Sequence, residues 1–195
     1  MSIRVSIDAS GGDFGFSVTI NAGIIALKAY DDLSINFVGD EAGIKNELNK
    51  NSSYLNFADR IDVTHASEVI NMSDSPSVAL RHKKDSSMRV AINLVKNGEA
   101  DACVSAGNTG ALMSIARFVL KTIKGVDRPA IMSAVPTLTG PTHVLDLGAN
   151  IDSRPSTLLQ FAIMGSIAVQ NTEILIIKAW TIIMNPMITR LSNEH

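Results

Sequence analysis

The sequence has one cysteine, one tryptophan and few aromatic residues, which make up 5% of its 195 positions. With Cys103 alone no intrachain disulfide can form, so a reducing compartment is expected. Cys103 lies between apolar neighbours, which favours a buried structural thiol over a nucleophile. The four histidines are scattered, and one cysteine cannot complete a zinc cage with them. No metal site is therefore predicted.

Long apolar runs and an excess of positive charge are also missing. No segment offers ~18 uninterrupted apolar residues, and the N-terminus lacks the apolar core of a signal peptide, so neither a membrane span nor secretion is predicted. The nearest approach, residues 174–184, is short and contains Lys178. The formal net charge is −2, which gives no electrostatic sign of a nucleic-acid partner.

Three common catalytic or cofactor-binding motifs are absent. No GxGxxG opens a helix and no GxxxxGK[ST] occurs, which argues against a dinucleotide-dependent dehydrogenase and a P-loop enzyme. No GxSxG elbow is present, and no Ser–His–Asp triad can be assembled with conviction. The sequence therefore predicts no cofactor.

Short β-rich runs alternate with helical patterns along most of the chain. Strands are predicted at 3–7, 35–38, 61–64, 102–104, 130–134 and 143–147, and helices at 17–30, 42–49, 76–81, 86–97, 109–122 and 156–168. This alternation predicts an α/β fold, a mainly parallel sheet flanked by helices. Both patterns fade near residue 170, so we expect one domain over 1–170 and a divergent tail over 171–195.

Three glycine-bearing loops follow predicted strands: DASGGDFG (8–15), SAGNTGA (105–111) and DLGAN (146–150). Glycine allows close backbone approach to a ligand, and a following helix presents free N–H groups to an anion. Ligands of α/β sheets gather beyond the carboxyl ends of the strands. The candidate residues in these loops are Asp8, Gly12, Asp13, Ser105, Gly107, Asn108, Thr109, Gly110, Asp146 and Asn150.

Two alternatives apply to these loops. Asn108 or Thr109 could simply cap the helix that follows, and Asp8 and Asp13 could satisfy loop N–H groups. A basic run, RHKKDSSMR (81–89), adds Arg81, Lys83 and Arg89 as candidate anion contacts. A solvated helix face is the alternative for this run.

The segments DASGGDFG, DSPSVALRHKKDSSMRVAINLVKNGEADACVSAGNTGALM, RPA and LDLGANID…LLQFAIMGS together resemble the bacterial phosphate acyltransferase family of phospholipid synthesis, over residues 3–170. The resemblance implies reversible conversion of acyl-[acyl carrier protein] and inorganic phosphate into acyl phosphate and free carrier protein. A membrane acyltransferase would then pass the acyl group to glycerol 3-phosphate. It also implies a fold like that of isocitrate dehydrogenases and phosphotransacetylases. Full-length relatives are expected to be cytoplasmic homodimers that visit the membrane surface.

In this chemistry phosphate itself is the nucleophile, so positioning and fixed N–H donors for the oxyanion matter more than a strong base. The predicted catalytic residues are Asn108, Ser105 and Asp8. Thr109 and Gly107 would help to hold phosphate or the oxyanion. Positive charge would come from Arg81, Lys83 and Arg89, while Asp8, Asp13, Asp146 and Asn150 would shape the opposite wall.

Two departures from the family are visible. Phe16 stands where the family usually has proline after GGDFG, and relatives continue well beyond this length. We therefore expect the sequence to be a truncated member with a non-native tail. The alternatives are an inactive remnant that only binds phosphate or a partner, and a phosphotransacetylase acting on short acyl-CoA.

Overall fold

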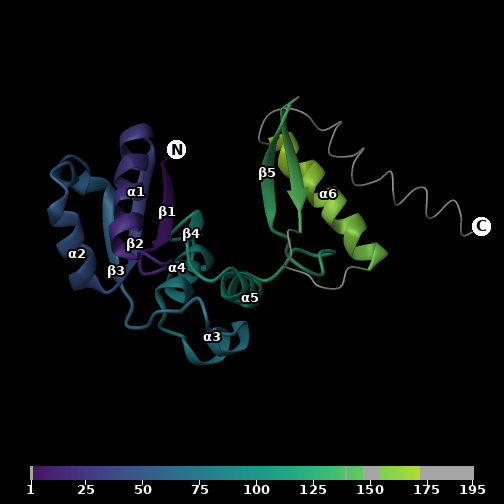
Figure 1. The fold of residues 1–195 in the computed structure, drawn as a ribbon, viewed down its shortest axis with the longest axis horizontal. Coiled ribbons are helices and arrows are strands. Elements are labelled where there is room, and N and C mark those ends of the chain that lie inside the picture. Colours follow the sequence, from purple (N-terminus) through teal and green to yellow (C-terminus); the bar gives the residue numbers. More distant parts are fainter. Residues whose placement is uncertain (1, 139, 147–153, 172–195) are drawn as a thin grey trace, which may run out of the picture. The chain divides into compact units, whose positions relative to one another are not determined.

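The computed structural model describes residues 2–138, 140–146 and 154–171. The chain forms two compact units, Met1–Lys121 and Thr122–His195 (Figure 1). In chain order, the first unit contains β1 (Ile3–Asp8), α1 (Phe16–Ala29), β2 (Leu33–Gly39), α2 (Glu41–Lys50), the 3-10 helix η1 (Tyr54–Arg60), β3 (Ile61–His65), α3 (Pro76–His82), α4 (Ser87–Lys96), β4 (Ala102–Ser105) and α5 (Thr109–Leu120).

All four strands of the first unit are parallel and lie in the order β3-β2-β1-β4. This confirms the α/β class, and each predicted strand of this unit is present. The chain passes from β1 to β2 on one side and later returns to β4 on the other side. The carboxyl ends of β1 and β4 therefore bound the point where the strand order reverses, which is where α/β sheets bind ligands. Asp8 pairs in register with Ser105 at this point.

Helices cover both faces of the sheet, as buried parallel strands require. On one face, Ile20, Ile24 and Leu27 of α1 pack with Ile35 and Phe37 of β2, together with side chains of α2. On the other face α4 brings its apolar side against the sheet, where Ala91 packs with Val38. A hydroxyl on β1 fixes this helix, since Ser6 Oγ donates to the Ala91 carbonyl oxygen at 2.9 Å.

The second unit contains β5 (Met132–Thr137), β6 (Gly140–Leu145) and α6 (Pro155–Asn171). In the described part of this unit β5 and β6 pair with each other, antiparallel. The sequence predicts a mainly parallel sheet, and this antiparallel pair is an exception to it, while the ligand-binding edge expected at the end of the strand at 143–147 stays a prediction. The physical reason is the connection between the two strands, which is far too short for a parallel crossover and permits only a hairpin.

The predicted tail lies outside the described residues except for Asn171, and the division at residue 170 stays a prediction. Among the helices that the structure describes, none has the length and apolar character needed to cross a bilayer.

One stabilising contact of the first unit involves η1, which the sequence analysis did not predict. The Arg60 guanidinium donates to the carbonyl oxygen of Leu27 at 2.9 Å and of Tyr30 at 2.8 Å, at the end of α1. It also reaches the carbonyl oxygens of Asp31 and Leu33. The last carbonyls of a helix lack intrahelical partners, so a fixed cation is favourable there.

We predict that Arg60→Lys lowers the free energy of unfolding by about 1–2 kcal/mol, because an ammonium cannot reproduce the planar set of four bonds. Urea unfolding followed by circular dichroism measures this. Arg81→Lys, at an exposed arginine, is the matched control and should change the value by less than ~0.5 kcal/mol. Equal effects of the two substitutions would contradict the assignment.

Candidate anion-binding site

Two glycine-bearing loops touch where β1 and β4 end. A Cβ atom added to Gly11 would lie 2.5 Å from Asp8 Oδ2 and 3.2 Å from the Gly107 nitrogen. Gly12 has φ +86, and a Cβ atom there would lie 3.1 Å from the Ala106 carbonyl oxygen. Side chains at these two positions would force the loops apart. Glycine is therefore required here by close approach, and at Gly12 also by conformation.

A buried carboxylate holds together the two loops that follow β1 and β4, and we call this region the corner. Asp8 is 2% exposed. Its Oδ1 accepts a hydrogen bond from Ser87 Oγ at 2.6 Å, and its Oδ2 accepts one from Ser105 Oγ at 2.7 Å. Ser87 lies in the first turn of α4, where the helix dipole favours a negative charge. Asp8 thus joins the end of β1 to the start of α4 and to the end of β4.

The same bonds occupy the donors of the β4 corner. Ser105 has one hydroxyl proton, which it gives to Asp8, and its oxygen accepts the Gly107 N–H at 3.1 Å. In this arrangement Ser105 and Gly107 have no donor left for a ligand. Both oxygens of Asp8 are engaged and shielded, which suits a positioning role better than that of a general base.

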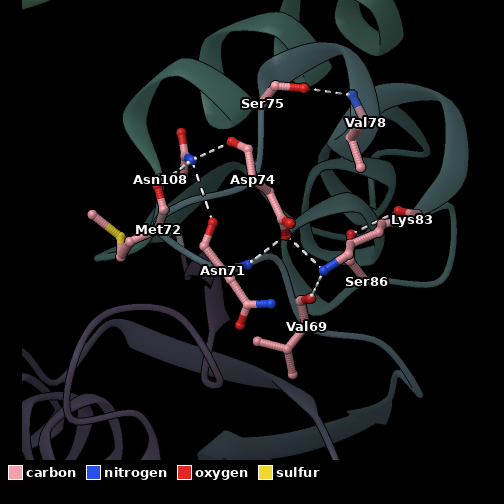
Figure 2. A network of polar contacts seen from close by, with 9 residues as sticks. All are labelled: Val69, Asn71, Met72, Asp74, Ser75, Val78, Lys83, Ser86 and Asn108. Carbon is pink, nitrogen blue, oxygen red and sulfur yellow. Dashed lines mark hydrogen bonds and ion pairs between the residues drawn. The ribbon is translucent and has the colours of Figure 1, made fainter.

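The side chain of Asn108 is also fully engaged within the protein. Its Oδ1 accepts the Ala111 N–H at 3.0 Å and caps α5, which confirms the alternative predicted from the sequence. Its amide nitrogen donates to the carbonyl oxygens of Asn71, Met72 and Asp74 at 3.3, 3.0 and 2.9 Å (Figure 2). Its side chain therefore fixes the preceding loop as well as the helix.

The basic run contributes less free charge than its sequence suggests. The Lys83 ammonium lies 2.6 Å from Asp74 Oδ2 and donates to the Val69 carbonyl oxygen at 2.6 Å. The bond from Lys83, with a second from the Asn71 N–H, lowers the pKa of the Asp74 carboxyl. The Arg89 guanidinium lies 5.4 Å from the centre of the Phe118 ring. Arg81 is exposed and makes no ion pair with any described residue.

Two backbone donors at the start of α5 remain free. The N–H groups of Thr109 and Gly110 have no hydrogen-bond partner within the described ranges, and both residues are exposed. The first N–H groups of a helix lack intrahelical acceptors and carry partial positive charge. Within the described ranges the N–H groups of Gly12 and Asp13 are also without a partner, but they do not belong to a helix, so they lack the partial positive charge of a helix start.

The remaining candidates are placed as follows. Asp13 is exposed, without a hydrogen bond to any part of the chain that the structure describes. Asp146 belongs to the second unit, where its N–H donates to the Ile131 carbonyl oxygen at 2.7 Å. Asn150 lies outside the described residues. The wall that these residues were expected to form stays a prediction.

Sequence reasoning missed Ser87 and Asp74. The sequence did offer a helix-capping signal next to Ser87, because Ser86 and Ser87 precede an apolar helical pattern. Ser86 caps α4 by accepting the Arg89 N–H. Nothing in the local sequence links Ser87 to Asp8, which lies 79 positions away.

Cys103 behaves as the sequence predicted. It packs beside the apolar clusters under α4. Burial raises the pKa of its thiol to about 11, so the thiol stays protonated near neutral pH. No group of three or more histidine, cysteine, aspartate or glutamate side chains in the described ranges could hold a metal ion.

Comparison with known proteins identifies the family. The family model described as "Fatty acid synthesis protein" matches residues 3–175, which is most of the chain. The chain belongs to this family. Curated relatives called "Phosphate acyltransferase" include those of Ruthia magnifica, 65% identical over 89% of this chain and 51% of the relative, and Methylococcus capsulatus, 56% identical over 87% and 49%. A relative from Legionella pneumophila (strain Paris) is 54% identical over 88% and 50%.

The chain thus spans about half the length of the curated relatives that it matches. The match includes the glycine-bearing loops at 8–15 and 105–111, and all of the first unit from β1 to α5. Membership of the family agrees with the resemblance drawn from the sequence.

We predict that Asp8→Asn lowers the free energy of unfolding by about 2 kcal/mol, because the amide offers one acceptor where two hydroxyl donors converge. Chemical denaturation is the measurement. Asp13→Asn removes the same charge from an exposed neighbour and should stay within ~0.5 kcal/mol of the parent. Parent-like stability of the Asp8 variant would show that the corner does not depend on this carboxylate.

Proposed function

We propose that the chain carries the phosphate-binding part of an acyltransferase of fatty acid and phospholipid synthesis. The substrates would be inorganic phosphate and acyl-[acyl carrier protein], and the products acyl phosphate and free carrier protein, with no cofactor. The observation that carries the proposal is the pair of unpartnered N–H groups, those of Thr109 and Gly110, on a corner fixed by Asp8. The names of the relatives support the same reaction class.

The reaction needs little covalent chemistry from the protein. Phosphate is largely dianionic near pH 7. One of its oxygens attacks the thioester carbonyl carbon, a C–O bond forms, and collapse of the tetrahedral intermediate breaks the C–S bond. The thiolate of the carrier's prosthetic arm leaves and takes up a proton. Binding of the anion in a fixed position, rather than general-base catalysis, is the main requirement.

The roles follow from which donors are free. Thr109 and Gly110 would contact phosphate through the backbone. Asp8, Ser105 and Asn108, together with Gly12 and Gly107, would act by holding the corner in shape. Arg81 would supply unpaired positive charge, while Arg89, Asp13, Asp146 and Asn150 stay proposed members of the site.

Several wider features belong to the same proposal. Acyl carrier protein would be the partner at this site, and a membrane glycerol-phosphate acyltransferase would use the product. A homodimer, a cytoplasmic location and contact with the membrane surface are proposed for the full-length protein.

A proline substitution separates the backbone donor from the rest of the corner. We predict that Thr109→Pro raises the dissociation constant for inorganic phosphate at least about tenfold, because a hydrogen bond to a charged group contributes ~1.5–3 kcal/mol. The helix should persist. Proline fits its first position, and Asn108, with φ −63 and ψ 110, is extended and so avoids the α conformation that is disfavoured before proline.

Isothermal titration calorimetry with phosphate measures this effect, and Thr109→Ala is the matched control because it keeps the N–H and removes only the hydroxyl. Parent-like affinity of Thr109→Pro would remove this donor from the site. Turnover of palmitoyl-[acyl carrier protein] is assayed with the same proteins. Phosphate binding without acyl phosphate formation would favour the alternative of a binding remnant, which the half-length match to the relatives makes worth testing.

A further inference from the structure

The loop between β3 and α3 is held by two separate groups that meet at one residue. The first is the Asn108 amide, which donates to the Asp74 carbonyl oxygen as well as to those of Asn71 and Met72. The second is the Lys83 ammonium, which binds the Asp74 carboxylate and the Val69 carbonyl oxygen. We call residues 69–74 the clamped loop. Figure 2 shows both groups converging on it.

The clamped loop is also closed on itself. The Asn71 N–H donates to Asp74 Oδ2 at 2.8 Å, and the Asp74 N–H donates to the Asn71 carbonyl oxygen at 3.1 Å. Ser75, which follows, caps α3 by accepting the Val78 N–H. Asp74 therefore contacts both the Lys83 ammonium and the Asn108 amide, and it also closes the turn that begins at Asn71.

The loop runs into α3, and the start of α3 lies against the first turn of α5. Pro76 begins α3, and a Cβ atom added to Gly110 would lie 3.1 Å from Pro76 Cγ. The exposed N–H groups of Thr109 and Gly110 belong to this turn. A displaced loop would shift the surface against which the turn packs, and would release the Asn108 side chain that caps α5.

We propose that Asn108, Lys83 and Asp74 are positioning residues, which fix the clamped loop against the first turn of α5 and so set the geometry of its anion-binding N–H groups. The inference rests on the proposed function, since it assigns these residues a role in phosphate affinity. Lys83 and Asn108 would affect phosphate binding indirectly, because their polar side-chain atoms already bind the clamped loop.

Substitution of Asp74 tests the inference, because positioning and electrostatics predict opposite changes in phosphate affinity. Asp74→Asn removes a negative charge and frees the Lys83 ammonium, so electrostatics alone would strengthen phosphate binding. Positioning predicts the opposite, a dissociation constant raised about three- to tenfold. Asp40→Asn is the matched control. Asp40 caps α2 by accepting the Gly43 N–H, which asparagine can also do, and the change should stay within about twofold.

A second variant separates the cap of α5 from the clamp. Asn108→Ser keeps a capping oxygen, as Ser75 and Ser86 do for α3 and α4, but loses the three bonds to the loop. It should raise the dissociation constant for phosphate by a similar factor. Combined with Asp74→Asn, it should add little, because both changes release the same loop, whereas a direct phosphate contact from Asn108 would make the effects additive.

Inorganic phosphate is titrated into the ¹⁵N-labelled 195-residue chain, and the amide signals of Thr109 and Gly110 are followed by NMR. The account expects these signals to shift in the parent, with weaker binding in both variants. Unchanged or tighter binding in either variant, or additive effects in the double variant, overturns the inference while the proposed function stands. A parent whose two signals do not respond to phosphate refutes the proposed function instead.

Discussion

The buried Asp8 carboxylate is the interaction on which the candidate site depends. It accepts hydroxyl protons from Ser87 at the start of α4 and from Ser105 at the end of β4. A buried charge is costly unless its hydrogen bonds are satisfied, and both oxygens of Asp8 have donors. Because one of those donors, Ser105, also receives the Gly107 N–H, the carboxylate fixes the backbone of the turn as well as the side chains around it.

The arrangement divides the polar groups of the corner into two sets. Side chains that the sequence marks as catalytic, Ser105 and Asn108, have their donors committed to the protein itself. The backbone N–H groups just beyond them, at Thr109 and Gly110, stay unpartnered in the described chain. Fixed backbone dipoles suit a small oxyanion because they need no reorganisation when charge develops. The committed side chains matter because they keep those dipoles in place.

Much of the local structure could be predicted from the sequence. The four parallel strands and the helices between them follow from alternating apolar patterns, and the cap at Asn108 follows from its place before an apolar helix. The contacts between distant residues could not be predicted. Ser87 reaches Asp8 across 79 positions, and Lys83 is neutralised by a carboxylate that only the loop geometry brings to it.

The second unit shows where pattern alone misleads. The runs that form β5 and β6 have the composition of strands, yet composition does not tell with which strand each one pairs. The short connection between them was the available signal for a hairpin. The basic run at 81–89 predicts an anion site from charge, although two of its four Lys and Arg residues, Lys83 and Arg89, interact with Asp74 and with the Phe118 ring. Charge counted along a sequence does not report which cations are already paired.

Amide hydrogen exchange at the β4–α5 corner tests the central claim most directly. The account predicts that the Gly107 amide proton is protected by Ser105, that those of Thr109 and Gly110 exchange at rates close to those of an unstructured chain, and that added phosphate slows the last two. A freely exchanging Gly107, or Thr109 and Gly110 amides that are already protected without phosphate, would contradict it.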